Sequence, residues 1–261
     1  MGRERPFIEA QEATWPAAEI AELGPWRARF SRGGGRRVGS ARPRDPEAAS
    51  AQRPELLEGL SAIEAWYRAR EAPAYLQFTD AQVSTLGAEV EARGWRAEAP
   101  TRFYSAPVAD VAARPLSTDR RPYLIHVKAP LAAVDALWRE DGISAGRRAV
   151  MARAKNGAIW VARVDHRVGG AVFVSVGDRE TPSPRVAQIH GLYIAPWARR
   201  RQAAADLVSQ AARWAETQGA AELSIDVLAE NASARALYER IGCVEAGGYV
   251  YYRKETSGAE E

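Results

Sequence analysis

The stretch that decides the fold runs from Gln188 to Lys254. It begins with QIHGLYIAP (188–196), WARRRQ (197–202) and AAADLVSQAARWAETQG (203–219), and it continues with AELSIDV (221–227), AENASARALYERIG (229–242) and CVEAGGYVYYRK (243–254). The lengths and apolar spacings predict a strand, an arginine-rich turn, a helix, a strand, a helix and a strand. Unpaired N–H groups at a helix start attract anions, and Arg199, Arg200 and Arg201 add full charges at that point. The pattern indicates binding of a phosphorylated cofactor.

Two segments of this stretch resemble signatures of the GNAT superfamily of N-acetyltransferases. LYIAPWARRRQAAADL (192–207) looks like the family's acetyl-CoA loop, in which a strand and a proline lead into R-x-x-G-x-G/A and a long helix. AENASARALYERIGC (229–243) is similar to the second signature, N-x-x-A-x-x-L-Y-x-x-x-G-F, and five positions fall in register: Asn231, Ala234, Leu237, Tyr238 and Gly242. Residues 122–187 resemble the family through strand order alone.

The resemblance assigns roles to particular residues. It implies that the main chain of Leu192, Tyr193 and Ile194 binds the pantetheine arm of acetyl-CoA. It implies that the pyrophosphate is wrapped by Arg199, Arg200, Arg201, Gln202, Ala203 and Ala204. It also implies that Asn231 contacts the cofactor arm and that Tyr238 protonates the departing sulfur. From the residues alone, Asn231 is an N-cap and Tyr238 is a core aromatic.

The acetyl-CoA loop departs from the family pattern at one residue. If Arg199 takes the arginine position, Gln202 and Ala204 take the two glycine positions, and glutamine is unusual at the first. Glycine there tolerates a positive φ, so Gln202 is expected to strain the turn. A one-residue slip would instead place alanines at both glycine positions.

The acceptor amine must lose a proton before it attacks. His190 lies two residues before Leu192 on the same strand, so strict alternation puts both side chains on one side. An ordinary histidine pKa suits a base, and a water chain or Asp226 are the alternatives. No spacing of His and Cys suggests a metal site, so no metal is expected.

Composition places the chain in a broad class. The 261 residues suit one large domain or two ordinary ones, with 46% hydrophobic and 26% charged residues. No apolar run is long enough for a membrane span, and the first residues lack a signal-peptide pattern. The single cysteine, Cys243, falls in an expected buried strand and fits a reducing compartment. We therefore expect a cytoplasmic monomer or homodimer without a membrane partner.

An internal repeat appears when the chain is shifted by 148 residues against itself. Trp66 then falls on Trp214, Gly94 on Gly242, and the strand 74–79 on the strand 222–227. Both halves show helix, strand, helix and aromatic strand. The sequence predicts an α/β protein of two tandem GNAT-like units, residues 1–117 and 118–261, each with a mixed, mostly antiparallel sheet flanked by helices.

The expected elements follow from periodicity and turn residues. In the first unit we expect strands at 26–31, 37–41, 74–79 and 102–108, helices at 55–70 and 81–93, and an exposed loop at 42–55. A linker is expected at 111–122 and a frayed tail at 255–261. In the second unit we expect strands at 123–127, 158–164, 170–176 and 186–194 and helices at 131–140 and 145–154 before the C-terminal stretch.

The first unit lacks the chemistry of the second. Under the same shift, Asn231 falls on Val83 and Tyr238 on Val90. The N-terminal unit is therefore predicted to be a degenerate partner that covers one face of the catalytic unit, and it either only stabilises that unit or also shapes the substrate groove.

These observations predict an N-acetyltransferase that moves an acetyl group from acetyl-CoA to a primary amine, on a small molecule or peptide, by direct attack in a ternary complex. The alternative is a catalytically silent acyl-CoA-binding regulatory or structural protein, which Gln202 favours. Nucleic acid is an unlikely partner despite an arginine-rich stretch: Arg27, Arg29, Arg32, Arg36, Arg37, Arg42 and Arg44. Arg27 and Arg29 are expected to line one solvated strand face. The basic face could equally receive an acidic substrate or the far end of CoA.

Overall fold

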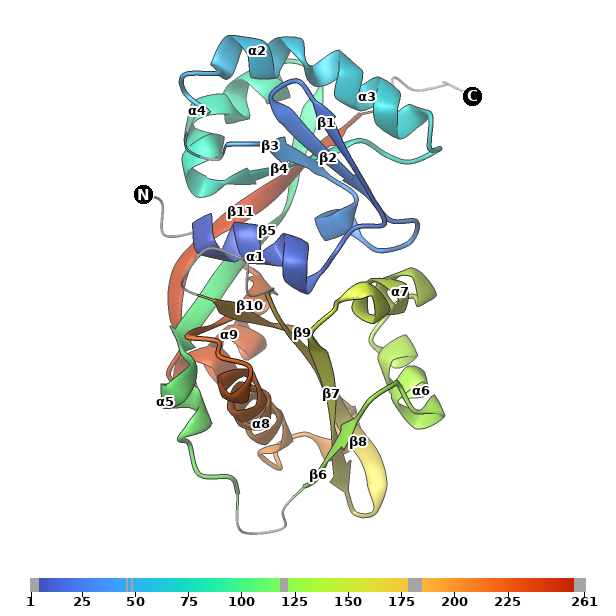
Figure 1. The fold of residues 1–261 in the computed structure, drawn as a ribbon, viewed down its shortest axis with the longest axis vertical. Coiled ribbons are helices and arrows are strands. Elements are labelled where there is room, and N and C mark those ends of the chain that lie inside the picture. The colour runs from blue at the N-terminus through green and yellow to red at the C-terminus, as the bar shows by residue number, and fades with distance from the viewer. Residues whose placement is uncertain (1–4, 46, 48, 118–121, 178–184, 256–261) are drawn as a thin grey trace.

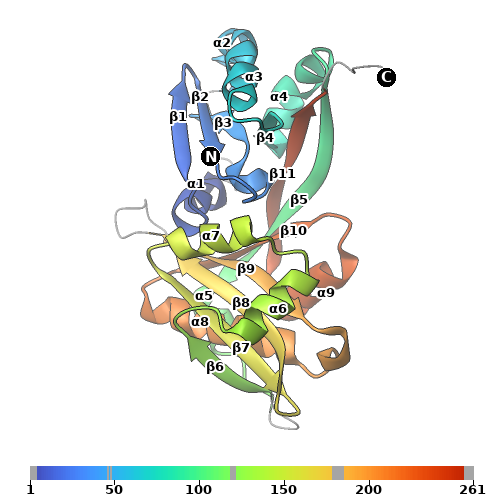
Figure 2. The ribbon, with the colours of Figure 1, turned by 90° about the vertical axis from the view of Figure 1, so that its right-hand side faces the viewer.

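The computed structural model describes residues 5–45, 47, 49–117, 122–177 and 185–255, whose strands form one mixed sheet (Figure 1). The strand order is β1-β2-β3-β4-β11-β5-β10-β9-β8-β7-β6. The two halves of the chain occupy opposite ends of an elongated molecule, and helices cover both faces of the sheet (Figures 1 and 2). The predicted mixed α/β architecture is confirmed, but the strands form a single continuous sheet.

The N-terminal half packs short helices around the first strands. Its elements are α1 (Arg5–Thr14), β1 (Glu19–Leu23), β2 (Trp26–Phe30), the 3₁₀ helix η1 (Arg36–Val38), β3 (Ala41–Pro43), α2 (Arg53–Glu58), α3 (Leu60–Arg68), β4 (Tyr75–Thr79), α4 (Asp80–Glu91), β5 (Trp95–Pro107) and α5 (Val108–Ala112). Thr79 starts α4 with a capping box, because its hydroxyl accepts from Gln82 N–H and the Gln82 side chain accepts from Thr79 N–H.

The C-terminal half follows the order that the sequence predicts. Its elements are β6 (Tyr123–Val127), α6 (Ala132–Glu140), α7 (Ala145–Arg153), β7 (Gly157–Val164), β8 (Arg167–Val176), β9 (Val186–Ile194), the 3₁₀ helix η2 (Pro196–Ala198), α8 (Ala203–Thr217), β10 (Glu222–Leu228), α9 (Ala232–Arg240) and β11 (Val244–Lys254). The long helix α8 buries Leu207, Val208 and Ala211 at helical spacing against β7, β8 and β9.

The last strand of each half is built into the other half. β5 pairs antiparallel with β10, and β11 pairs antiparallel with β4, while β5 and β11 pair with each other along the centre. Figure 1 shows both strands crossing from one end of the molecule to the other. Each half therefore completes the sheet of its neighbour.

Tyr104 and Tyr252, which the internal shift superposes, lie on the two exchanged strands, but their partners differ by one position from that shift. Tyr104 of β5 faces Ile225 of β10, and Tyr252 of β11 faces Leu76 of β4. The repeated order of elements in the two halves is thus accompanied by reciprocal strand pairing.

Several sequence-based boundaries were wrong. The helix expected at 55–70 breaks at Gly59, whose added Cβ would lie 2.9 Å from the Trp26 ring. The strand expected at 37–41 is replaced by η1 and a shorter β3. The expected linker begins as α5, while residues 118–121 and the last part of the expected tail lie outside the described residues. α1 and β1 had not been predicted, since neither has a strong periodic pattern.

The predicted solvated face of β2 was also wrong. Arg29 is only 2% exposed and its guanidinium donates to Ser40 and Gln77. Arg42, expected in an exposed loop, is buried and bonds Ile8 O and Glu12. Since buried guanidinium groups must be satisfied, these arginines fix strands rather than face solvent.

Candidate functional site

Strands β9 and β10 separate partway along their length. They pair in parallel from Val186↔Glu222 to Ile189↔Ile225, and their pairing ends there. Beyond Ile189, β9 continues to Ile194 and pairs only with β8. The edge of β9 that faces β10 therefore has main-chain groups without a strand partner from His190 onward.

A bulge at Gly191 shapes the point of separation. The β8–β9 register passes from Phe173↔His190 to Ala171↔Tyr193, which leaves one extra residue on β9. Gly191 has φ 56°, and an added Cβ would lie 2.9 Å from Met151 Cε. Its carbonyl accepts from Trp138 Nε1 at 2.8 Å. The strict alternation assumed for His190 and Leu192 is thus interrupted.

A cavity of about 300 Å³ opens where the strands separate. We call it the splay cavity. Residues of β9, β10, α9 and α7 line it, and four of the predicted site residues are among them: His190, Leu192, Asn231 and Tyr238. The structure thus places these four residues around one cavity.

Arg37 connects the two separating strands. It donates to Asp226 Oδ2 on β10 at 2.9 Å and lies 2.9 Å from His190 Nδ1 on β9. Asp226 also accepts from Gln11 and Tyr249, at 2.8 and 3.1 Å. The side chain of Asp226 is 2% exposed, so Arg37 supplies the charge that balances a buried carboxylate.

The contact with Arg37 fixes the tautomer of His190. A guanidinium can only donate, so Nδ1 must accept and the proton of the neutral ring lies on Nε2. Burial, and then Arg37 and Arg147, hold the pKa of His190 well below its ordinary value of 6.5. Nε2 is buried and has no hydrogen-bond partner among the described residues. His190 therefore presents an N–H donor rather than a free basic nitrogen.

Asn231 and Tyr238 lie on the same helix, α9. Asn231 caps the helix by accepting from Ala234 N–H at 3.1 Å, as its sequence position predicted. Tyr238 is 6% exposed, and its hydroxyl makes no hydrogen bond with another described residue. Burial, followed by Cys243 and Asp226, raises the pKa of Tyr238, so its hydroxyl keeps its proton.

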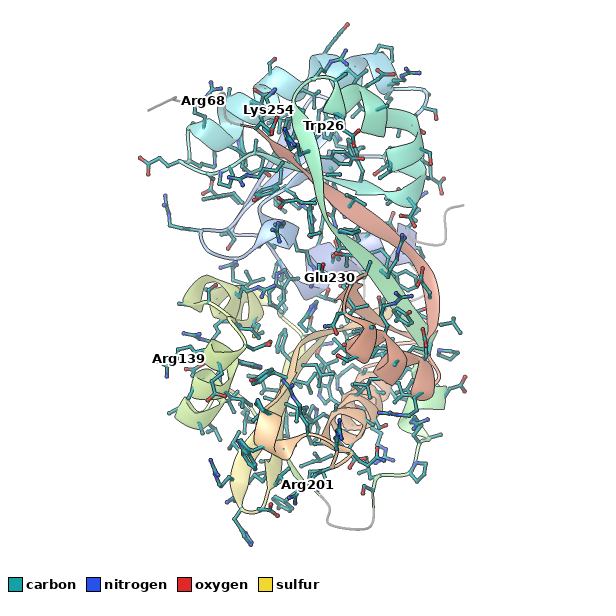
Figure 3. All side chains as sticks on the ribbon, turned by 180° about the vertical axis from the view of Figure 1, so that it is seen from behind. Trp26, Arg68, Arg139, Arg201, Glu230 and Lys254 are labelled. Atoms are coloured by element: carbon teal, nitrogen blue, oxygen red, sulfur yellow. The ribbon has the colours of Figure 1, made fainter. Side chains whose placement is uncertain are left out.

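The arginine turn lies at the far end of β9 (Figure 3, Arg201). Arg200 and Gln202 have φ of 60° and 61°, so positive φ alternates with negative φ as in an anion-binding nest. The N–H groups from Arg200 through Ala205 make no backbone hydrogen bond within the described chain. The turn therefore offers unpaired amides beside the positive end of α8.

The arginines of the turn differ in their hydrogen-bond and ion-pair partners. Arg199 Nε donates to Ile194 O at 3.1 Å, which ties the turn to β9. Arg201 pairs with Asp165 at 3.0 Å on the surface. Gln202 occupies the left-handed N-cap of α8, the conformation that glycine would adopt without cost, and Ala203 and Ala204 begin the helix.

Sequence reasoning missed the residues that the rest of the fold brings to the cavity. Trp15, Arg37, Asp141 and Arg147 line it with the predicted residues. The Trp15 ring lies 4.6 Å from the His190 ring, between centroids. The run RGGGRR (32–37) was the available signal for Arg37, but its position beside β9 depends on long-range packing.

The described residues lack two features, a cluster of metal-ligating side chains and a helix that could span a membrane. The residues that the structure describes hold no group of three or more His, Cys, Asp or Glu arranged for a metal ion. In the same residues, no helix combines the length and apolarity that a membrane crossing requires.

Comparison with known proteins finds relatives of the C-terminal half. Residues 125–243 match the model of the acetyltransferase (GNAT) family. Residues 125–243 therefore resemble a GNAT acetyltransferase domain. One curated relative is the aminoglycoside N(6')-acetyltransferase type 1 of Serratia marcescens, which is 39% identical over 72 residues, or 28% of this chain and 49% of that protein. A namesake from Acinetobacter genomosp. 13 is 32% identical over 74 residues, 28% of this chain and 51% of that protein. The chain spans about half the length of the curated relatives it matches.

Solved structures extend the likeness to the whole fold. A GCN5-related N-acetyltransferase from Kribbella flavida has a TM-score of 0.72 at 13% identity, over 98% of this chain and 97% of that one. A tandem GNAT protein from the clavulanic acid biosynthesis pathway has a TM-score of 0.59 at 14% identity, over 84% and 76% of the two chains. Identities this low show the fold alone.

Proposed function

We propose that the protein is an acetyl-CoA-dependent N-acetyltransferase that acetylates a primary amine by direct attack in a ternary complex. Residues 118–261 carry the working site, and residues 1–117 are a degenerate GNAT-like partner that completes it. The observation that carries the proposal is the splay cavity between β9 and β10, with Tyr238 and Asn231 on its wall.

The chain has groups suited to acetyl-CoA along one continuous path. The edge of β9 at Leu192, Tyr193 and Ile194, which has no strand partner on the side of β10, fits the amides of a pantetheine arm. The nest from Arg199 to Ala204 fits a pyrophosphate, because its amides and guanidinium groups form charge-assisted hydrogen bonds. Acetyl-CoA supplies the acyl group as a thioester.

The reaction requires two proton movements. The amine nitrogen bonds to the thioester carbonyl carbon and loses a proton, while the carbon–sulfur bond breaks and the sulfur gains a proton. Tyr238 is the proposed acid, since it keeps its proton and its hydroxyl is uncommitted. His190 is the proposed N–H donor beside the reacting groups, and its predicted use as a base requires that Arg37 first release Nδ1. Asp226 is already bonded by three donors, so we propose the water chain as the path for the amine proton.

Calorimetry with acetyl-CoA, followed by thiol release with a panel of amines, tests the proposal. We expect saturable binding of acetyl-CoA and amine-dependent release of CoA. Binding without release would favour the alternative, a silent acyl-CoA-binding protein. No heat at millimolar acetyl-CoA would contradict both.

A further inference from the structure

A second cavity, of about 490 Å³, lies at the junction between the two halves. We call it the arginine cavity. Its charged lining comprises Arg32, Arg36, Arg70, Glu71 and Arg147, and its ring-bearing walls are Phe30 and Tyr75. All but Arg147 come from the N-terminal half, from the loop after β2 and from the segment that enters β4.

Arg147 of α7 joins this cavity to the splay cavity. It lines both, so its side chain stands at their boundary. Figure 2 shows α7 at the junction, beneath the N-terminal strands. The arginine turn that we assign to the pyrophosphate lies at the opposite end of the molecule from Trp26 and Arg68 (Figure 3). A molecule in the arginine cavity would thus approach the splay cavity from the side away from that turn.

The contact between the glycine loop and α7 has a defined geometry. Ser144 Oγ donates to Gly33 O at 2.6 Å. A Cβ added to Gly146 would lie 2.3 Å from the carbonyl carbon of Gly33, so only glycine permits this approach. The two walls of the cavity are therefore held together by backbone contact, independently of its arginines.

The arginines of this cavity are not equally neutralised. Arg36 pairs with Glu98, and Arg70 pairs with Glu19 at 2.9 Å and stacks on the Trp66 ring. Arg32 and Arg147 make no hydrogen bond or ion pair through their side chains with another described residue.

Arg147 is an exposed residue whose charged neighbours include both signs. Surrounding protein, and then Arg37, lower the pKa of Arg147, while the attraction of Asp141 opposes them without an ion pair. Glu71 is the one acidic residue among those described in the cavity lining. Two unpaired guanidinium groups thus face one carboxylate in a space large enough for a small molecule.

We infer that the acceptor amine also carries an anionic group, a carboxylate or a phosphate, which binds Arg147 and Arg32 in the arginine cavity while the amine enters the splay cavity. This inference rests on the proposed function. Guanidinium groups form paired, charge-assisted hydrogen bonds with both kinds of anion. A polycationic amine would instead be repelled by the same two arginines.

Matched pairs of amines test the inference on the full chain. We propose 4-aminobutyrate against 4-aminobutyramide, phosphoethanolamine against ethanolamine, and spermidine as the polycation. We expect the kcat/KM of an anionic member to exceed that of its neutral partner by at least about 10-fold, mainly through KM. The pair that shows the larger ratio distinguishes carboxylate from phosphate.

Variants connect this ratio to the cavity. Arg147→Ala, alone and with Arg32→Ala, should reduce the ratio to within about twofold of one, and Arg147→Lys should restore part of it. Arg68→Ala is the control, because Arg68 is outside both cavities and lies on the surface of α3. A wild-type preference for the neutral or polycationic amines would overturn the inference, as would a preference for anions that survives the double substitution.

A separate measurement keeps the two proposals distinguishable. If no amine is acetylated, the proposed function fails, and the same pairs are compared by calorimetry on the protein with CoA. Tighter binding of the anionic member that depends on Arg147 would still support the anion site. Equal binding of the two members would overturn it.

Discussion

The strand pairs β3–β4 and β9–β10 are both parallel and each is followed by a helix, but a cavity lies beside β9–β10 and a hydrophobic cluster beside β3–β4. β9 and β10 separate after Ile189 and Ile225 and leave a cavity beside α9. β3 and β4 pair at Ala41 and Leu76, and the helix that follows, α4, packs on a hydrophobic cluster. Two similar backbone arrangements thus yield a cavity in one half and a packed core in the other.

Side chains account for this difference. The positions that match Asn231 and Tyr238 under the internal shift are Val83 and Val90, and Val90 is fully buried in the cluster. The N-terminal half instead supplies Trp15 and Arg37 to the cavity of its neighbour. The C-terminal half therefore lines the cavity with polar side chains of α9, and the N-terminal half adds side chains to the same cavity.

Removal of the N-terminal half should have the largest effect. A fragment of residues 118–261 lacks β5, which pairs with both β10 and β11, and it lacks β4 at the other edge of β11. We expect no cooperative thermal transition in circular dichroism and no binding of CoA, because one edge of β10 and both edges of β11 would be exposed. A stable fragment that binds CoA as the full chain does would show that the halves are independent.

Arg37→Met should have the next largest effect. The substitution leaves the buried Asp226 carboxylate without its cation, and removing one partner of a buried pair costs about 3–5 kcal/mol. Urea denaturation should show this loss in the free energy of unfolding. Asp226→Asn in the same background should recover part of it, because a double-mutant cycle isolates the pair.

An exposed ion pair of the same half provides the control. Arg44 pairs with Glu22, and their side chains are 53% and 39% exposed. Arg44→Met should change stability by only about 0–1 kcal/mol. If Arg37→Met and Arg44→Met lower the free energy of unfolding equally, the Arg37–Asp226 ion pair does not stabilise the protein more than an exposed pair does.

Tyr238→Phe tests whether Tyr238, which matches Val90 under the internal shift, acts as an acid. If Tyr238 protonates the leaving sulfur, kcat should fall by about 100-fold, or about 2.7 kcal/mol, with little change in the affinity for acetyl-CoA. Steady-state kinetics and calorimetry measure the two quantities. Tyr104→Phe is the control, since its ring lies 5.9 Å from that of Tyr238 but its hydroxyl bonds Glu239 and Arg235. An unchanged kcat in Tyr238→Phe would remove the acid role.

Local patterns predicted the C-terminal half well. The expected strands at 123–127 and 186–194 have the observed bounds, and Asn231 was expected to cap the helix that it caps. Apolar periodicity and capping act over a few residues, so they are visible in the sequence. The same signals are weak in α1, which packs on the distant strands β8 and β9, and in β1, which pairs with β2.

The site depended more on contacts between distant residues. Arg37 reaches His190 across 153 positions, and the bulge at Gly191 changes the strand alternation on which the base prediction rested. The exchange of β5 and β11 has no local signature, since either strand could equally pair within its own half. Sequence patterns could therefore indicate which residues of the C-terminal half form a site but not which residues of the N-terminal half complete it.

Gln202→Gly should have the smallest effect and the opposite sign. Gln202 has φ 61°, where a side chain costs about 1–2 kcal/mol and glycine costs little, so we expect a gain in the free energy of unfolding of up to about 1 kcal/mol. Ala204→Gly is the matched control, because it lies on the same turn without a positive φ and should lose about 1 kcal/mol. Calorimetry on the two variants also tests the site, since a closer main chain at residue 202 should bind acetyl-CoA more tightly. If Gln202→Gly destabilises the protein as Ala204→Gly does, the left-handed turn is not strained, and the departure from the family's glycine would no longer favour a silent binding protein.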